Sequence, residues 1–259
     1  MPVDKTVWEV KKYLTTGGSL WLFLDYDGTL AGFAPTPDHI FPDPATIDLI
    51  SRLAGLSRTQ VVILSGRRLA HILKLVPVDE IWRAGTYGIE LLNPEGQYIE
   101  RVPFESIEPI MEKVKLSWQE LIDDREGFYL EDKRWCLAIH ARFAPDSLAS
   151  KVLAQAQSLA WKMIKMGDFR VTAGHKFLEI GPAIADKGNT VQYLLGQNGA
   201  PDILPVYIGD DERDEEAFEA IQERGGVTFR VASASIKTRA DHLLANPDAV
   251  REWLRDLLT

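Results

Sequence analysis

The chain has 259 residues, of which 29 are basic and 38 acidic, so its formal net charge at pH 7 is -9. This acidic balance argues against non-specific binding to nucleic acid or to an anionic membrane surface. The single cysteine, Cys136, excludes an intramolecular disulfide, and with neither a secretory leader nor a membrane-length apolar stretch in view we expect a cytoplasmic protein of two domains.

The first strongly patterned segment is WLFLDYDGTL, Trp21 to Leu30, in which four apolar residues precede Asp25 and Asp27. A short apolar run that ends at a glycine turn is typical of an interior strand of a parallel sheet, where ligands collect at the carboxyl ends of strands. The Asp-Gly pair between apolar residues is also common in hairpin turns, and taken alone this segment would favour the hairpin. A calcium loop of the EF-hand type is excluded, because the required Gly and Glu are missing from its sixth and twelfth positions.

The following segments repeat the order of buried strand and helix. Asp43 and Pro44 favour a helix start after a proline-rich loop that begins at Pro35. The apolar strand 61–64 then ends at Ser65, and helical spacing of apolar residues follows. Alternating strands and helices imply right-handed crossovers and a parallel sheet. Ser65 therefore reaches the same sheet edge as the aspartates, although a serine before a helix is usually only its N-cap.

The middle third of the chain has a different pattern, which predicts an inserted α+β domain. Apolar spacing predicts helices over 107–122 and 147–166 and strands over 127–143, 169–172 and 176–180. Alternation between Trp135 and Phe143 predicts a half-buried antiparallel strand, with Phe143 on the inner face and His140 and Arg142 together on the outer face.

The parallel pattern returns near Asp186, where a helix begins, and the buried strand 204–208 ends in GDDERD at 209–214. A third polar group thereby reaches the sheet edge. A further strand at 227–231 and a helix after Asn246-Pro247 complete the chain. The predicted fold is α/β, a Rossmann-like parallel-sheet core with an inserted α+β cap. We place the core domain at residues 1–102 and 182–259 and the cap domain at 103–181.

Four motifs stand in a fixed order: DYDGT at 25–29, Ser65 after its strand, Lys187 at a helix start, and GDDERD at 209–214. In this order the chain resembles the haloacid-dehalogenase-like phosphohydrolases that carry a large α+β cap between the second and third motifs. The resemblance spans essentially the whole chain. It tightens to the trehalose-6-phosphate phosphatase family through FLDYDGTL, VVILSGR, GFYLEDKRWCLAIHAR, GHKFLEI, DKG and YIGDDERDEEAF.

The resemblance implies hydrolysis of trehalose 6-phosphate with Mg²⁺ as cofactor. Asp25, Asp210 and the backbone carbonyl of Asp27 would hold the ion, which prefers oxygen ligands. Asp25 would attack phosphorus and form an aspartyl-phosphate, and Asp27 would act as general acid and then as general base. Ser65 would bind a phosphate oxygen, and Lys187 would neutralise charge beside the nucleophile.

Asp211 and Asp214 are expected to orient the site from behind these groups. Taken singly, Lys187 is more often a solvated lysine, and Asp214 is more often a carboxylate that stabilises a helix N-terminus.

The residues that the resemblance assigns to substrate binding are Arg67, Glu131, Lys133, His140, Arg142, Lys176 and Glu179. Glu131 and Lys133 share a strand face by their spacing of two. Lys176 and Glu179 do not, so one of them falls outside the pocket unless a bulge or turn intervenes. For each cap residue an ordinary exposed charge is about as frequent as a ligand.

Three positions depart from the family pattern. Tyr87 stands where histidine is usual, Arg213 where threonine is usual, and Gly181 where arginine is common. They leave open sucrose 6-phosphate or mannosyl-3-phosphoglycerate as the substrate and, in a different class, a phosphosugar-binding module without catalysis. The expected partner is a small sugar phosphate, with no nucleic acid and no membrane, and we expect a monomer.

Overall fold

The structure, a computed structural model, describes residues 3–32, 41–165, 167–197, 202–234 and 236–259. The chain forms two compact units: the core unit, Met1–Ile99 with Asp186–Thr259, and the inserted unit, Glu100–Ala185. The segment predicted as a cap, 103–181, falls inside the inserted unit. The proline-rich loop predicted from Pro35 lies largely outside the described residues.

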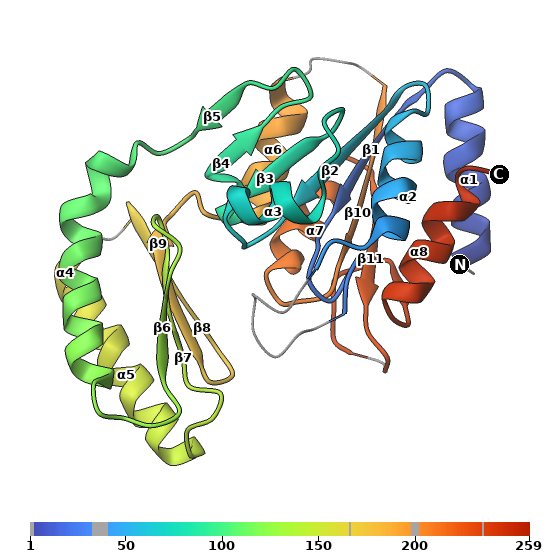
Figure 1. Cartoon of the computed structure of the whole chain (residues 1–259). Helices are drawn as coiled ribbons and strands as arrows, with labels where there is room; N and C mark the ends of the chain where they lie inside the picture. Colours follow the sequence, from blue (N-terminus) through green and yellow to red (C-terminus); the bar gives the residue numbers. More distant parts are fainter. Residues whose placement is uncertain (1–2, 33–40, 166, 198–201, 235) are drawn as a thin grey trace. The chain divides into compact units, whose positions relative to one another are not determined.

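A sheet of eight strands, counted over the described residues, forms the centre of the core unit (Figure 1). Its spatial order is β12 (His242–Leu244), β11 (Val227–Val231), β10 (Ile203–Gly209), β1 (Ser19–Leu24), β2 (Thr59–Leu64), β3 (Trp82–Gly85), β4 (Glu90–Leu92) and β5 (Tyr98–Glu100). Strands β12 to β3 are parallel, and β4 is antiparallel to β3. The predicted parallel-sheet core is confirmed. The carboxyl ends of β10, β1 and β2 therefore lie along one edge.

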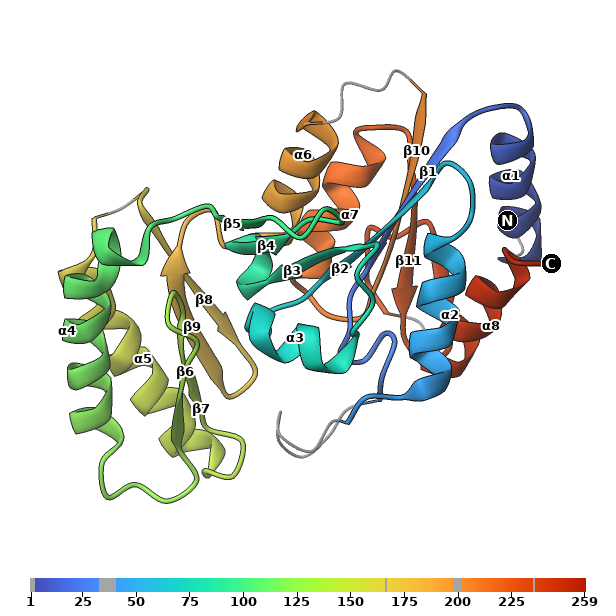
Figure 2. The same ribbon diagram turned by 45° about the horizontal axis from the view of Figure 1, so that its top comes forward.

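Helices cover both faces of this sheet (Figure 2). On one face lie α1 (Val3–Thr15), α2 (Pro44–Ala54), α3 (Leu69–Leu75) and α8 (Pro247–Asp256), and on the other α6 (Lys187–Gln197) and α7 (Asp214–Gln222). In β1, Leu22 and Leu24 join the apolar cluster of the first face, whereas Phe23 joins that of the second. A strand that is apolar on both sides has to be covered on both, which explains the unbroken apolar runs in the sequence.

Two helix starts in the core unit follow the predicted capping pattern. The Asp43 carboxylate accepts backbone N–H groups of Ala45 and Thr46, and the Asn246 side chain accepts that of Ala249. Each capping residue stands directly before a proline, which suits the first helical position. Both predictions are confirmed.

The inserted unit is a four-stranded antiparallel sheet with two helices packed on one face. Its spatial order is β6 (Tyr129–Asp132), β7 (Leu137–His140), β9 (Phe177–Pro182) and β8 (Phe169–Gly174), and its helices are α4 (Phe104–Ile122) and α5 (Asp146–Met163). The Trp118 indole on α4 donates to the Ala156 carbonyl on α5 at 2.9 Å. The sheet face opposite the helices carries Glu131, Ala138 and Glu179 in register.

The strand predicted from Trp135 to Phe143 is shorter in the structure, and the prediction is wrong at both ends. The strand begins at Leu137 and stops at His140, and the Ala144 N–H then donates to the Ala141 carbonyl in a turn. Phe143 was expected on the inner face, yet it is 72% exposed. The alternation continued past the strand because the turn residues happen to keep the same polarity pattern.

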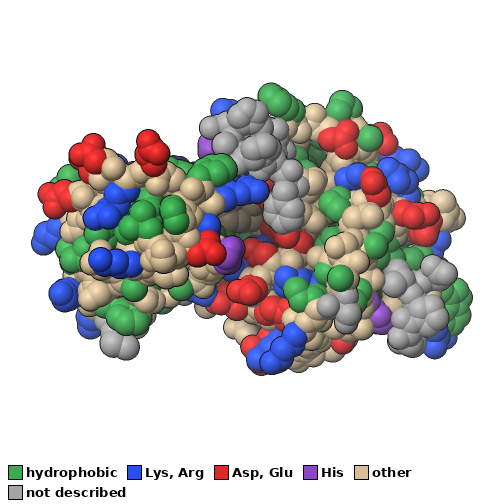
Figure 3. Space-filling view, turned by 90° about the horizontal axis from the view of Figure 1, so that it is seen from below, with side chains coloured by type: hydrophobic (Ala, Val, Ile, Leu, Met, Phe, Trp, Pro, Cys, Tyr) green, Lys and Arg blue, Asp and Glu red, His purple; other side chains and the backbone are tan. Residues whose placement is uncertain are grey.

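No helix in the described part of the chain is long and apolar enough to cross a membrane. On the face shown in Figure 3, basic side chains are scattered among acidic and neutral ones, which fits the acidic net charge.

Candidate active site

Three polar residues follow three neighbouring strands of the core sheet. Asp25 follows β1, Ser65 follows β2 and Asp210 follows β10. The Asp25 N–H continues the sheet pattern by donating to the Ile208 carbonyl at 3.0 Å. Asp25 is 4% exposed and Ser65 1%. The sheet topology thus brings together groups that are up to 185 positions apart, 210 minus 25, in the sequence.

Lys187, the first residue of α6, is buried between two carboxylates. Its Nζ lies 2.9 Å from Asp25 Oδ1 and 2.6 Å from Asp214 Oδ1. Burial alone would lower the pKa of Lys187, but Asp214 and Asp25 outweigh it and hold that pKa well above its ordinary value. Lys187 is therefore a fixed positive charge beside Asp25, not the solvated lysine that is commoner at a helix start.

Asp214 is fully buried, and both of its oxygens are occupied. Oδ1 accepts Lys187 and the Tyr207 hydroxyl at 2.6 Å, and Oδ2 accepts the backbone N–H groups of Asp210 and Asp211 at 2.9 Å each. Burial would raise the pKa of Asp214, but Lys187, Tyr207 and the backbone donor lower it. Asp214 thus fixes both the lysine and the loop that carries Asp210.

Asp211 shapes the same loop from the outside. It is exposed, and its Oδ1 accepts the backbone N–H groups of Arg213 at 2.9 Å and Asp214 at 3.2 Å. These contacts are internal to the loop.

The acidic groups at this edge fit a divalent cation. Carboxylate oxygens of Asp25, Asp210 and Asp214 lie within 4.8 Å of one another. Burial, with Asp211 and Asp214, raises the pKa of Asp210 to about 7, and burial raises that of Asp25 well above its usual range even with Lys187 beside it. One lysine does not balance these charges. Since the Asp214 oxygens are taken, Asp25 and Asp210 are the side chains that suit an oxygen-preferring ion such as Mg²⁺.

Asp27 follows Asp25 and is held by Arg67 from the turn after β2. Arg67 Nε lies 2.6 Å from Asp27 Oδ2, and Nη2 lies 2.8 Å from Oδ1. Gly28 then turns the chain with a φ of 76°, a backbone conformation that glycine adopts freely. Arg67, expected among the substrate-binding residues, thus contacts the expected acid/base residue in this structure.

Ser65 is not the N-cap of the helix that follows it. The N-cap position of α3 is Arg68, and Ser65 Oγ accepts the Arg67 N–H at 3.2 Å within the turn.

Four of the six predicted cap residues form one polar cluster on the face of the inserted sheet opposite its helices, here called the open face, although Lys133 and Glu179 in this cluster are buried. Lys133 Nζ lies 2.8 Å from Glu179 Oε2 and 3.7 Å from Glu131 Oε2, and His140 Nε2 lies 2.8 Å from Glu131 Oε2. Tyr129 stacks on the His140 ring with centroids 4.4 Å apart. Burial raises the pKa of Glu179 despite Lys133, so this carboxylate is held in a place that disfavours its charge.

The other two cap residues lie elsewhere. Lys176 stands in the turn before β9 with a φ of 53°, and its Nζ contacts the Ala144 carbonyl and Asp146 Oδ1 at 2.7 Å each. Arg142 is exposed beyond the end of β7. This separation of Lys176 from Glu179 agrees with their spacing of three in the sequence, which places them on different faces of a regular strand.

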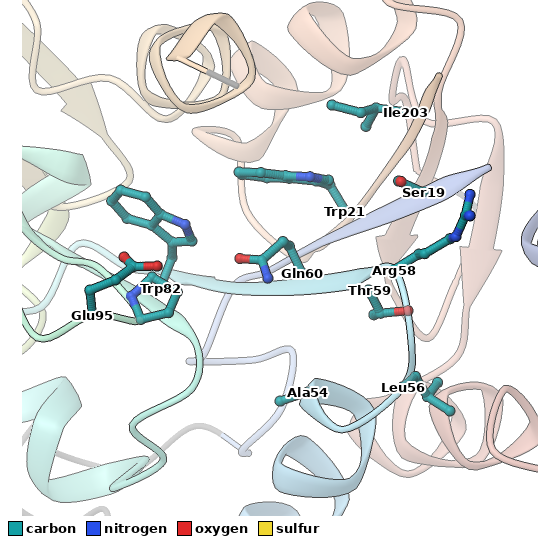
Figure 4. A pocket seen from close by; sticks show the side chains of 11 residues that line it. Ser19, Trp21, Ala54, Leu56, Arg58, Thr59, Gln60, Trp82, Glu95 and Ile203 are labelled. Atoms are coloured by element: carbon teal, nitrogen blue, oxygen red, sulfur yellow. The ribbon is translucent and has the colours of Figure 1, made fainter. Parts of the chain in front are cut away.

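A different recess lies at the opposite edge of the core sheet, where β1, β2, β3 and β10 begin (Figure 4). Two tryptophans, Trp21 and Trp82, form its apolar wall, with Gln60 and Glu95 nearby. Arg58 also lines this recess, and its guanidinium already donates to the Gly17 carbonyl. No cluster of carboxylates converges there among the described residues, so the chemistry belongs to the other edge.

Comparison with known proteins agrees with this geometry: the sequence profile of the trehalose-phosphatase family matches residues 23–247. The chain belongs to the trehalose-phosphatase family. Within this family it is 32% identical over 255 residues to trehalose-phosphate phosphatase B of Arabidopsis thaliana, covering 93% of this chain and 67% of that protein. It is 29% identical over 258 residues to trehalose 6-phosphate phosphatase RA3 of Zea mays, covering 93% and 70%.

Solved structures show the same fold. The C-terminal domain of C. albicans trehalose-6-phosphate phosphatase superposes with a TM-score of 0.82 at 22% identity, covering 97% of this chain and 96% of that one. The C-terminal domain of the Candida albicans trehalose synthase regulatory protein superposes with a TM-score of 0.78 at 13% identity, covering 98% of each chain. The trehalose-phosphatase fold is therefore found in proteins of both descriptions.

One member of the site and one pairing within it were not predicted from the sequence. Tyr207, in the middle of β10, is completely buried and donates to Asp214. A tyrosine in an otherwise apolar strand needs a partner for its hydroxyl, and that was the available signal. The pairing of Arg67 with Asp27 left no signal in the sequence, because it depends on two turns meeting.

Proposed function

We propose that the chain is a Mg²⁺-dependent phosphatase that hydrolyses trehalose 6-phosphate through a phosphorylated Asp25. The observation that carries this proposal is the buried Lys187 within hydrogen-bond distance of both Asp25 and Asp214, beside the half-buried Asp210. The lysine fixes the Asp25 carboxylate, and the neighbouring acids crowd it with negative charge. Attack of this carboxylate on an anionic phosphate therefore requires added positive charge at the site. The family match supplies the substrate class.

In the first step, an Asp25 oxygen forms a bond to phosphorus while the bond from phosphorus to the sugar oxygen breaks. Asp27 gives its proton to the departing oxygen. In the second step, Asp27 takes a proton from water, the water oxygen bonds to phosphorus, and the bond to Asp25 breaks. Phosphate leaves, and the carboxylate of Asp25 is regenerated.

Lys187 and Ser65 contribute charge and position. The Lys187 ammonium is present before substrate arrives and offsets negative charge on Asp25 and the phosphoryl oxygens. The Ser65 hydroxyl, held by its turn, donates to a phosphate oxygen. Because guanidinium groups bind phosphate as readily as carboxylate in a bidentate manner, we propose that Arg67 exchanges Asp27 for phosphate when substrate is bound.

Asp25, Asp210 and the Asp27 carbonyl would hold Mg²⁺, which supplies charge neutralisation for the phosphoryl group. Asp214 and Asp211 keep the Asp210 loop in place, as their contacts with its backbone support.

We assign the sugar contacts to the inserted unit acting as a cap domain. The open-face cluster of Glu131, Lys133, His140 and Glu179 pairs two carboxylates with one ammonium and one imidazole. Such a mixture accepts and donates hydrogen bonds without a large net charge, which suits a neutral disaccharide. A phosphoglycerate would call for additional cations; of the two candidates, Lys176 is engaged by Asp146 and Arg142 is exposed beyond the end of β7.

The test is phosphate release by the unmodified protein across a panel of trehalose 6-phosphate, sucrose 6-phosphate, mannosyl-3-phosphoglycerate and a small chromogenic ester, with and without Mg²⁺. We expect trehalose 6-phosphate to have the largest kcat/KM and the turnover to require the ion. A faster reaction with either other sugar phosphate would reassign the substrate. Binding of trehalose 6-phosphate without any turnover would point to a phosphosugar-binding module.

A further inference from the structure

The short 3-10 turn η2 (Thr86–Gly88) has a backbone that residues with side chains rarely adopt. Thr86 and Tyr87 are consecutive and have φ values of 48° and 57°. Left-handed residues other than glycine persist where their surroundings hold them, and they gather at functional sites. The Thr86 hydroxyl donates to Glu90 Oε2 at 2.8 Å, and Arg68 binds the same carboxylate through two nitrogens. The turn therefore presents Tyr87 in one fixed orientation.

Tyr87 touches two segments that carry active-site groups. Its N–H donates to the Ser65 carbonyl at 2.9 Å, and its carbonyl accepts the Thr190 hydroxyl at 2.8 Å, one turn after Lys187 on α6. Its ring lies directly on Gly66, where an added Cβ would come within 2.6 Å of a ring carbon. The Ser65 turn and the start of α6 are thus both in contact with Tyr87, which is 6% exposed.

The third segment is the acidic loop. The Arg213 guanidinium lies over the Tyr87 ring, 4.5 Å from its centre, as a cation–π pair. Arg213 stands between Asp211 and Asp214, three residues after Asp210, and its N–H donates to Asp211. The side chain that contacts Tyr87 therefore belongs to the loop that holds the expected metal ligand.

We propose that Tyr87 and Arg213 form a clamp that fixes the Asp210 loop relative to the Ser65 turn. Both are positioning residues: they set the distance between the carboxylates that hold the cation and the hydroxyl that binds phosphate. The clamp rests on the proposed function, since its effect is felt through the metal and the phosphoryl group.

The contact depends on the side chains that this chain has at these positions. The stack on the ring requires the cation of Arg213, and Gly66, which has no Cβ, leaves the space that the Tyr87 ring occupies.

The experiment is a double-mutant cycle with Arg213→Gln and Tyr87→Leu, read with a small chromogenic phosphate ester. Each single variant should raise the Mg²⁺ concentration for half-maximal turnover and lower kcat on the order of tenfold, because a misplacement of about 1 Å can cost up to about 10²-fold. The double variant should lose no more than the worse single variant, since both remove one contact. Tyr87→Phe keeps the ring and should match the unmodified protein.

A second readout does not depend on turnover. Scanning calorimetry should show a smaller Mg²⁺-induced rise in Tm for Arg213→Gln and Tyr87→Leu than for the unmodified protein. Arg239→Gln is the matched control, because it removes an exposed guanidinium that pairs with Glu219 on α7; its Mg²⁺ response should be unchanged.

Unchanged Mg²⁺ dependence in Arg213→Gln, or losses that multiply in the double variant, would overturn the clamp. A lower Tm with an intact Mg²⁺ response and intact kcat would overturn it as well, because that pattern is purely structural. If the unmodified protein turns over neither trehalose 6-phosphate nor the ester, the proposed function is wrong, and the calorimetric cycle still decides whether the clamp exists.

Discussion

The core unit and the inserted unit each bury one lysine among carboxylates, but the two clusters differ in balance. Lys187 faces Asp25 and Asp214, and Asp210 lies within reach of both acids, so three acids meet one lysine. Lys133 faces Glu179 and Glu131, and His140 binds the second of these. The core cluster is short of positive charge, whereas the inserted cluster comes close to neutrality. The first suits a metal and a phosphate, and the second suits an uncharged sugar.

The clusters also differ in how they are assembled. The contact between Lys187 and Asp25 joins residues 162 positions apart through the order of the parallel sheet. In the inserted unit, the register of three neighbouring antiparallel strands aligns Glu131 with Ala138 and Ala138 with Glu179. The core site therefore depends on the whole fold of its unit, and the inserted cluster on a single small sheet.

The largest effect is expected from Asp25→Asn, which disables the cluster of the core unit and leaves that of the inserted unit intact. It removes the proposed nucleophile and one anionic ligand together, so turnover of every ester should fall to background while the protein stays folded. Phosphate release and circular dichroism measure the two properties. Asp48→Asn, an exposed carboxylate on α2, serves as the control. Near-normal rates in Asp25→Asn would rule out the aspartyl-phosphate.

Asp27→Asn should have a smaller effect, because the backbone carbonyl ligand is kept and only the acid/base group is lost. A general acid or base typically contributes about 10²–10⁴-fold in rate. We expect a loss in this range in kcat, with a larger loss for a sugar ester than for an ester with a good leaving group, which needs less protonation. Equal losses for the two esters would argue that Asp27 acts by holding Arg67.

Replacing Lys133 with methionine tests whether the inserted cluster is as tightly coupled as its burial indicates. Removing one partner of a buried ion pair leaves Glu179 without its cation, and such changes typically cost about 3–5 kcal/mol. Chemical denaturation should show this loss at neutral pH. The variant Lys133→Met with Glu179→Leu should recover most of it, because no lone charge stays buried. A loss that the double variant does not recover would contradict a paired charge.

A pH effect should mark the charge imbalance in the core. The pKa of Asp210 is raised from 3.8 to about 7 in the folded state. Between about pH 4 and pH 7 the folded protein therefore keeps a proton on Asp210 that the unfolded protein has released. The Asp210 contribution to stability therefore falls as pH rises from about 4 to 7 in the absence of metal. Asp210→Asn lacks this titration. The stability of the variant minus that of the unmodified protein should therefore be larger at pH 8 than at pH 4. Added Mg²⁺ should remove the difference in the unmodified protein, and an identical pH profile for both proteins would contradict the raised pKa.

Local signals in the sequence predicted most of the core. The apolar runs before Asp25 and Ser65 and the Asp43 and Asn246 caps each follow from short-range rules. Contacts between turns that are distant in the sequence could not be predicted. Arg67 contacts Asp27, and Tyr87 contacts Arg213, only because the order of the strands in the sheet brings their turns together. The prediction of a strand as far as Phe143 was wrong, because alternation of apolar and polar residues does not show where a strand leaves its sheet.

The comparison between the two units is tested most directly by kcat/KM of Glu131→Ala on trehalose 6-phosphate and on a small chromogenic ester. Glu131 is part of the inserted cluster and lies outside the core chemistry, and Glu126→Ala, an exposed acid of the same unit, is the control. A large fall for the sugar phosphate with little change for the small ester is the expected result, because only the sugar uses these contacts. Equal losses on both esters would contradict a division between phosphoryl transfer in the core unit and sugar selection in the inserted unit.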